Sequence, residues 1–215
     1  MTEERRKIAA AIIAGGQSSR MQAGGIPGDK FLQPLGSRPL IAHVIERLSS
    51  QVDYLFINAN GAPSRFAPWA LPVISDKPAP HGGPLAGLLT ALDHARHFPV
   101  LLTAAADAPF LPADLVERLY RRHAKTDARI VIACSDNRLH PIVGLWRTDL
   151  VDELRDWLAN APKASVLAFA SQIGFDTVNF ALAPLAGQQE TYDPFFNINR
   201  PDDLIKAQRL NEALH

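Results

Sequence analysis

The chain has 215 residues, 47% of them hydrophobic, and its 22 basic and 22 acidic side chains give a formal net charge of zero. This length allows a large core, and the balanced charge gives no basic field that would attract nucleic acid or an anionic membrane. The single cysteine, Cys134, excludes an internal disulfide and any cysteine-based zinc site, which fits a reducing compartment. No interior stretch resembles a flexible linker, so we expect a single domain over residues 1–215.

The N-terminus superficially resembles a secretory signal, because the basic residues 5–7 precede an apolar run at residues 8–14. That run has only seven residues, Glu3 and Glu4 offset most of the positive charge, and a glycine turn follows instead of a cleavage site. No stretch approaches the length needed to cross a bilayer. We therefore expect a cytoplasmic protein without a membrane contact.

Short apolar runs that predict strands alternate along the chain with amphipathic stretches that predict helices. The predicted strands are residues 8–13, 54–58, 72–74, 100–106, 129–134, 141–146 and 175–179, and the helical stripes lie within residues 40–48, 85–92 and 150–158. This alternation indicates an α/β fold with a mostly parallel sheet. Asp136 and Asn137 predict a hairpin, so the sheet should be mixed, and Pro201 marks the start of a last helix.

The end of the first strand carries the strongest functional signal. Ile13 and Ala14 lead into Gly15 and Gly16, which can turn backbone N–H groups toward an anion. The side chains that could add hydroxyl donors or positive charge follow soon after: Ser18, Ser19, Arg20 and Lys30. The alternative is a tight strand-to-helix turn with solvated charges. The glycine and lysine spacing fits neither the P-loop nor the dinucleotide-binding pattern.

Polar residues also follow the next two predicted strands. Asn58 can present a donor and an acceptor to a purine, although an asparagine at a strand end is often only a turn former. Asp76 follows the third strand, and Gly83 belongs to a glycine-rich turn that opens a helix and could bring amides against a ligand, or merely cap that helix.

Asp107 ends the apolar run at residues 100–106 and is a candidate ligand for Mg²⁺, which takes one or two carboxylates and completes its shell with water and phosphates. Its alternative role is to cap a helix that begins near Pro112. His140 is a weaker candidate, because a lone histidine beside a strand is usually structural.

No serine or cysteine has the context of an activated nucleophile. The glycine loop, Lys30 and Asp107 instead describe a site that aligns a nucleoside triphosphate and a metal, while an acceptor supplies the nucleophile.

Taken together, these segments resemble those of the molybdenum cofactor guanylyltransferases nearly from end to end of the chain. The opening loop, with Arg20, Met21 and the Asp29-Lys30 pair, indicates a nucleotidyltransferase. The segments that favour the molybdopterin branch are Gly83 to Gly87, Asp107 to Phe110 and Asn197 to Asn199, and His140-Pro141 follows in the family's order. The resemblance implies a three-layer αβα, Rossmann-like nucleotidyltransferase fold.

It also implies transfer of GMP from GTP to molybdenum-molybdopterin, with Mg²⁺ as the cofactor and pyrophosphate as the second product. By this resemblance, backbone atoms of residues 13–16 hold the nucleotide, Lys30 and Arg20 neutralise phosphates, and Asp107 binds the metal. Asn58 and Asp76 contact the nucleoside, whereas Asn197 and Asn199 meet the pterin. A monomer is expected, with molybdenum cofactor insertion chaperones and apo-molybdoenzymes as partners.

Two departures from the family pattern matter. Residues 22–29 form a longer connection than is usual, which puts the reach of Lys30 in doubt, and Ala108 replaces a threonine beside the metal aspartate. Two other functions remain open: a cytidylyltransferase acting on molybdopterin or a sugar-like phosphate, and a non-catalytic carrier of the finished cofactor.

Overall fold

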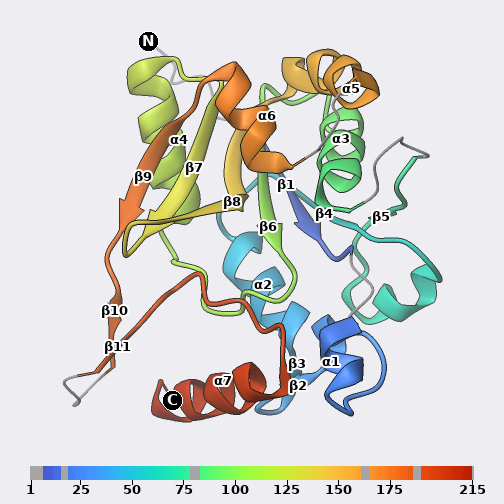
Figure 1. Cartoon of the computed structure of the whole chain (residues 1–215), viewed down its shortest axis with the longest axis vertical. Coiled ribbons are helices and arrows are strands. Elements are labelled where there is room, and N and C mark those ends of the chain that lie inside the picture. The colour runs from blue at the N-terminus through green and yellow to red at the C-terminus, as the bar shows by residue number, and fades with distance from the viewer. Residues whose placement is uncertain (1–6, 16–18, 78–82, 161–164, 186–189, 215) are drawn as a thin grey trace.

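The structure is a computed structural model, and it describes residues 7–15, 19–77, 83–160, 165–185 and 190–214. Its centre is a seven-stranded sheet with the order β5-β4-β1-β6-β8-β7-β9 (Figure 1). The strands are β1 (Ile8–Ile13), β4 (Tyr54–Asn58), β5 (Val73–Ile74), β6 (Val100–Ala105), β7 (Ile130–Ser135), β8 (Arg138–Arg147) and β9 (Asp176–Phe180). Only β8 runs antiparallel to its neighbours, so the expected mixed, mostly parallel sheet is confirmed.

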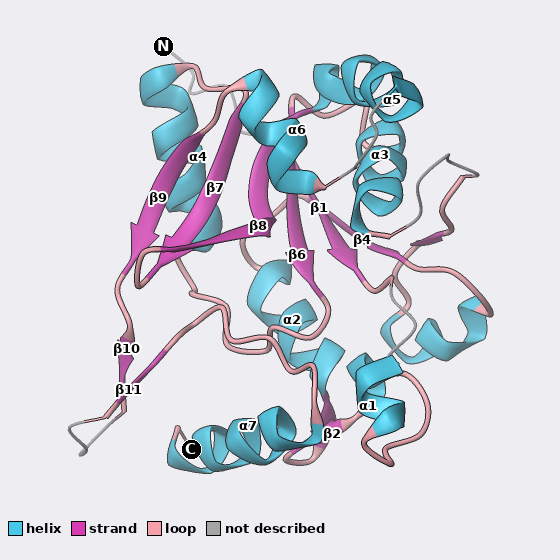
Figure 2. Ribbon diagram, viewed as in Figure 1, coloured by secondary structure: helices cyan, strands magenta, loops and turns pink. Residues whose placement is uncertain are grey.

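Helices cover both faces of this sheet, as Figure 2 shows. Alternate residues of β1 explain the layering: Ile8, Ala10 and Ile12 pack with α2 (Leu40–Ser49) and α4 (Leu115–Thr126), whereas the residues between them face the other layer. That layer consists of α3 (Pro84–His94), α5 (Val151–Asn160) and α6 (Val166–Ile173). Because both faces of β1 are covered, all six of its residues are buried. The three-layer αβα fold is confirmed.

The predicted hairpin is present, with Asp136 and Asn137 both in the left-handed region, at φ of 45° and 59°. The following strand is longer than predicted, because the ladder continues to the turn and pairs Ser135 with Arg138. The register shifts between Ile132, opposite Gly144, and Ala133, opposite His140, so residues 141–143 form a bulge.

A third apolar cluster lies beyond the carboxyl ends of the parallel strands. It joins α1 (Ser19–Ala23) and the small sheet of β2 (Pro34–Leu35) and β3 (Arg38–Pro39) to α7 (Pro201–Ala213), and Figure 1 shows these elements together at that end. Met21, Leu35 and Ile198 are fully buried in it. The remaining short elements are η1 (Lys30–Leu32), η2 (Pro63–Trp69), η3 (Thr148–Leu150), β10 (Ala183–Pro184) and β11 (Thr191–Tyr192). The cluster therefore anchors both the loop before Lys30 and the last part of the chain.

Candidate active site

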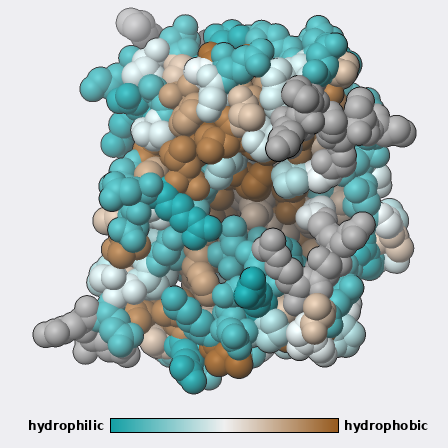
Figure 3. Space-filling model, in the orientation of Figure 1, coloured by the Kyte–Doolittle hydropathy of each residue, from teal (hydrophilic) through white to brown (hydrophobic). Residues whose placement is uncertain are grey.

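A pocket of about 150 Å³ opens at the carboxyl ends of β1 and β6. This location is the usual one for ligands in open α/β sheets. Figure 3 shows a hollow in the middle of this face, with hydrophobic surface on its walls. The predicted residues that line the pocket are Ile13, Ala14, Gly15, Lys30, Asp107, Asn197 and Asn199.

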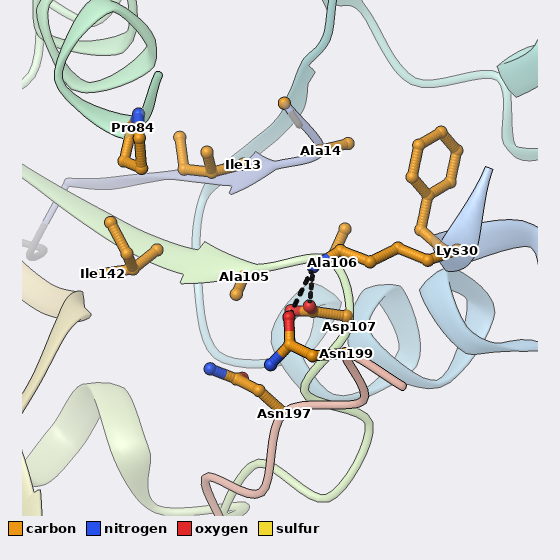
Figure 4. A pocket seen from close by; sticks show the side chains of 12 residues that line it. Ile13, Ala14, Lys30, Pro84, Ala105, Ala106, Asp107, Ile142, Asn197 and Asn199 are labelled. Carbon is orange, nitrogen blue, oxygen red and sulfur yellow. Dashed lines mark hydrogen bonds and ion pairs between the residues drawn. The ribbon is translucent and has the colours of Figure 1, made fainter. Parts of the chain in front are cut away.

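Lys30 and Asp107 form an ion pair inside this pocket (Figure 4). The Lys30 ammonium also donates a hydrogen bond to Asn199 Oδ1 over 3.0 Å. The Asp107 side chain is only 6% exposed and that of Lys30 is 23% exposed. The longer connection at residues 22–29 therefore does not keep Lys30 out of the pocket.

Asp107 follows β6 and does not serve as a helix cap. Helix α4 begins at Leu115, with Asp114 in the N-cap position, so the capping alternative is wrong for Asp107. The Asp107 carbonyl accepts a hydrogen bond from the Ile198 N–H over 3.0 Å. This bond ties the carboxylate-bearing turn to the segment that carries both asparagines.

Asn197 and Asn199 reach the pocket from the extended segment before α7. Asp203 fixes the end of that segment, because its Oδ2 accepts hydrogen bonds from the N–H groups of Asn199 (3.0 Å) and Arg200 (2.9 Å). The side-chain oxygen of Asn197 is buried and accepts no hydrogen bond from the described residues. Such an atom costs free energy unless a ligand or water supplies a donor.

Asn58 and Asp76 lie beside the glycine loop and outside the pocket lining. Residues Ile13 and Asn58 are paired in the β1–β4 ladder, and the Ala14 N–H donates to the Asn58 carbonyl over 2.8 Å. Asn58 Nδ2 donates to Asp76 Oδ1 over 2.8 Å, and Asn60 Nδ2 donates to Asp76 Oδ2 over the same distance. The Asp76 carboxylate, which follows β5, is thus held by two side-chain amides at the end of β4.

Two other predicted residues are only partly placed. Gly83 is the N-cap residue of α3 with φ of 83°, and its neighbour Pro84 lines the pocket in its place. The backbone of Arg20 lies in α1. Gly16 and the side chain of Arg20 lie outside what the structure describes.

His140 does not line the pocket. Its Nε2 lies 2.7 Å from Ser135 Oγ, and the Ser135 hydroxyl donates to Asp193 Oδ1 over 2.8 Å. Burial lowers the pKa of His140, with Asp193 opposing the shift and Arg138 adding to it. Ser135 is 0% exposed, so these three side chains cannot act as a nucleophile with its base. They instead fasten the segment after Asp193 to the β7–β8 hairpin.

Several residues that shape the site have little sequence signal. Phe31, Ala105, Ala106 and Ile142 line the pocket, Ile142 because the bulge in β8 lies there. The Ser135–Asp193 bond joins residues far apart in the chain, and nothing in the spacing of either residue indicates it.

The donors in the pocket suit Mg²⁺ better than a transition metal. Among the described residues no group of three His, Cys, Asp or Glu side chains could enclose a metal ion. The pocket does hold the Asp107 carboxylate and the unsatisfied amide oxygen of Asn197. Hard oxygen donors of this kind, few in number, fit an ion that completes its shell with water and substrate phosphates.

The glycine turn, the partly buried lysine–aspartate pair and this sheet order are the features expected of a nucleotidyltransferase. The family model described as "MobA-like NTP transferase domain" matches residues 10–174. Molybdenum cofactor guanylyltransferases of Brucella ovis and Brucella melitensis are each 63% identical over 97% of this chain and 94% of their own. The chain belongs to the MobA-like NTP transferase family and, within it, to the molybdenum cofactor guanylyltransferases.

Solved structures agree on the fold. Molybdopterin-guanine dinucleotide biosynthesis protein A from Archaeoglobus fulgidus superposes with a TM-score of 0.72 at 24% identity, over 95% of this chain and 98% of the other. A nucleotidyl transferase from Methanothermobacter gives 0.70 at 20% identity, over 97% and 99%. No helix in the described part of the chain is long and apolar enough to cross a membrane.

Proposed function

We propose that the protein transfers GMP from GTP to molybdenum-molybdopterin. An oxygen of the acceptor's terminal phosphate attacks the α-phosphorus of GTP, a new P–O–P bridge forms, the α–β bond breaks, and pyrophosphate leaves with its electron pair. The product is a guanine dinucleotide of the cofactor. The observation that carries this proposal is the partly buried Lys30–Asp107 pair, which lines the same pocket as Ala14 and Gly15 of the glycine turn.

In the absence of ligand, Lys30 and Asp107 neutralise each other. A triphosphate offers Lys30 a more highly charged partner, so the ammonium can turn to the phosphates without crossing the pocket. That exchange leaves the Asp107 carboxylate to hold Mg²⁺. When bound, the metal would stabilise charge that develops on the phosphate oxygens.

The remaining residues orient the two substrates. Backbone groups of Ala14 and Gly15 border the pocket and can meet phosphates, because neither residue has a bulky side chain there. Asn58 and Asp76 lie toward the nucleoside side of the site, next to the glycine turn. Asn197 and Asn199 form the wall on the other side, and we assign them to the acceptor. The names of the 63% identical relatives supply the choice of guanine.

The test incubates the purified protein with molybdenum-molybdopterin, Mg²⁺ and each of GTP, CTP, ATP and UTP. We expect pyrophosphate release and a dinucleotide mass with GTP. Faster turnover of CTP would favour the cytidylyltransferase alternative. Binding of the finished cofactor without pyrophosphate release from any triphosphate would favour the carrier alternative.

A further inference from the structure

We propose that Arg65 is a positioning residue that holds Lys30 and the Asn60–Asp76 pair in a fixed relation to each other. The inference rests on the proposed function, in which Lys30 meets the triphosphate and Asp76 the nucleoside. The sequence motifs indicate no role for Arg65, because it lies in η2, outside the motif segments at residues 13–30, 58–60, 83–87, 107–110 and 196–199.

The guanidinium of Arg65 has a partner for each of its three nitrogens. Nη1 forms an ion pair with Asp29, Nη2 donates to the Asn60 carbonyl, and Nε donates to the Ala62 carbonyl over 3.2 Å. The two side chains of the ion pair are 28% and 26% exposed, so the pair is partly shielded from water. Such a pair contributes more than one on the open surface.

The contact with Asp29 acts directly on the catalytic lysine, because Asp29 precedes Lys30 in the chain. On the other side of Lys30, the Phe31 ring lies 5.7 Å from the guanidinium carbon of Arg65. Phe31 stacks on Phe66 with ring centroids 5.2 Å apart, and both rings are buried. Arg65 therefore contacts the residues on both sides of Lys30, Asp29 through an ion pair and Phe31 through its ring.

This contact matters because the connection between the end of α1 at Ala23 and Lys30 contains Gly24, Gly25 and Gly28. The third apolar cluster anchors the start of the connection, so Lys30 holds one position only if the other end is fixed as well. The Asp29–Arg65 pair fixes that end against η2.

The second arm of Arg65 reaches the nucleoside side of the site. The Asn60 carbonyl accepts from Arg65, while the Asn60 side chain holds Asp76 through two bonds, one from Nδ2 to Asp76 Oδ2 (2.8 Å) and one from the Asp76 N–H to Oδ1 (2.9 Å). Gly61 leaves room for this arm, since a Cβ there would lie 3.0 Å from Arg65 Nη2, and its φ of +86° also favours glycine. One guanidinium thus links the two halves of the nucleotide site.

Lysine could not replace arginine in this position. A lysine ammonium carries its three donors on one compact nitrogen, so it cannot reach Asp29 and the carbonyls of Asn60 and Ala62 at the separate positions of the three guanidinium nitrogens. We therefore expect Arg65→Lys to behave like Arg65→Ala, although it keeps the charge.

The experiment compares wild-type protein with Arg65→Ala, Arg65→Lys and a control, Arg121→Ala, which removes an exposed ion pair with Glu117 on α4. We expect both Arg65 variants to lower kcat/KM for GTP roughly tenfold to a hundredfold, because misplacing a reacting group by about 1 Å costs this much. The control should retain wild-type kcat/KM. Backbone hydrogen exchange should rise at residues 29–33 and 60–62 in the Arg65 variants and stay unchanged in β6.

Unchanged exchange at residues 29–33 would overturn the inference. Faster exchange with wild-type kcat/KM would also overturn it, since Arg65 would then be only structural, and so would full activity of Arg65→Lys. If the wild-type protein forms no product from GTP, the proposed function fails. The exchange measurement and calorimetric titration with Mg-GTP then still decide the role of Arg65: a rise in exchange with weaker GTP binding supports it, and any other result contradicts it.

Discussion

Gly87 of α3 lies directly against the buried side-chain oxygen of Asn58, and a Cβ at position 87 would come within 2.5 Å of that atom. The helix can approach the end of β4 this closely only because residue 87 has no side chain. The Asn58 amide is thereby pressed toward Asp76, to which it donates.

Gly87→Ala should therefore destabilise the protein by about 1–3 kcal/mol, the usual cost of overpacking, and raise KM for GTP by displacing Asn58. Chemical unfolding and steady-state kinetics measure the two effects. Asn58→Ala removes the atom that clashes, so the double variant should be more stable than the sum of the two single changes predicts. Simple additivity would show that the two residues do not interact.

Asp107→Ala should lower turnover by roughly a thousandfold, since metal stabilisation of this kind contributes several kcal/mol. The melting temperature and Mg²⁺-dependent pyrophosphate release are measured on the same sample, and EDTA should abolish the wild-type reaction. Asp107→Asn, which keeps the size of the side chain, should be similarly inactive. Near-normal turnover per folded molecule in either variant would contradict the metal role.

Lys30→Ala should reduce kcat/KM for GTP, because a positive charge is lost from a site partly shielded from water. It also leaves the buried Asp107 carboxylate without its cation, so we expect a lower melting temperature in the absence of nucleotide. Titration with Mg²⁺ should restore part of that stability. A wild-type kcat/KM would mean that Lys30 does not touch the triphosphate.

Asn197→Ala should act on the acceptor and spare the nucleotide. A hydrogen bond to a charged group contributes about 1.5–3 kcal/mol, so KM for molybdenum-molybdopterin should rise roughly tenfold to a hundredfold. The measurement varies the acceptor at saturating GTP and then GTP at saturating acceptor. A rise confined to KM for GTP would place Asn197 on the wrong substrate.

The stability of the protein should fall as the pH drops below about 6.5, in part through His140. Burial lowers the pKa of His140 in the folded state, so the unfolded chain binds the proton more readily between the folded pKa and the unfolded value of about 6.5. The contribution is fully present above that window and is lost as the pH falls through it. Urea unfolding at pH 7.5 and 5.5 should show a smaller loss for His140→Gln than for the wild type.

His94 provides the matched control for this titration. Burial lowers the pKa of His94 too. Its ring, however, forms a hydrogen bond with the Tyr54 hydroxyl in the layer of α3 and, within the described part of the chain, makes no contact with Asp193. His94→Gln should also flatten the pH dependence, but without weakening the attachment of Asp193. An equal pH dependence in His140→Gln and wild type would show that His140 does not titrate in this window.

The central sheet and the helices α2, α3 and α5 could be predicted from the sequence, because the strands are nearly continuous apolar runs and these helices carry clear apolar stripes; the short helix α6 was not predicted. β1, for example, matches its predicted bounds, since both of its faces are covered and every residue is apolar. Prediction was less accurate for β8, where hydrogen bonding at the hairpin extends the strand beyond its apolar part.

In the site, the glycine turn, Lys30 and Asp107 could be placed together, because parallel strands bring their carboxyl ends to one edge. The Arg65 contacts could not be predicted, since a guanidinium in an irregular segment has no periodic pattern to reveal its partners. His140, the weaker candidate from the sequence, lies outside the pocket in the structural role that a lone histidine usually has, because its ring is engaged by Ser135 and packs on Phe195. Contacts between polar side chains that lie far apart in the chain cannot be predicted from the order of residues alone.

The bond between Lys30 and Asn199 joins residues separated by 169 positions. A ribosome therefore releases the glycine turn and Lys30 long before the residue that completes their pocket exists. The growing chain contains strands β1, β4, β5 and β6 early, but the pocket lacks one wall until residues 197–199 have been made and have packed beside Asp107. The chain should therefore become able to catalyse the reaction only late in its synthesis. A chain that stops before Asn199 should contain the glycine turn but lack a complete pocket.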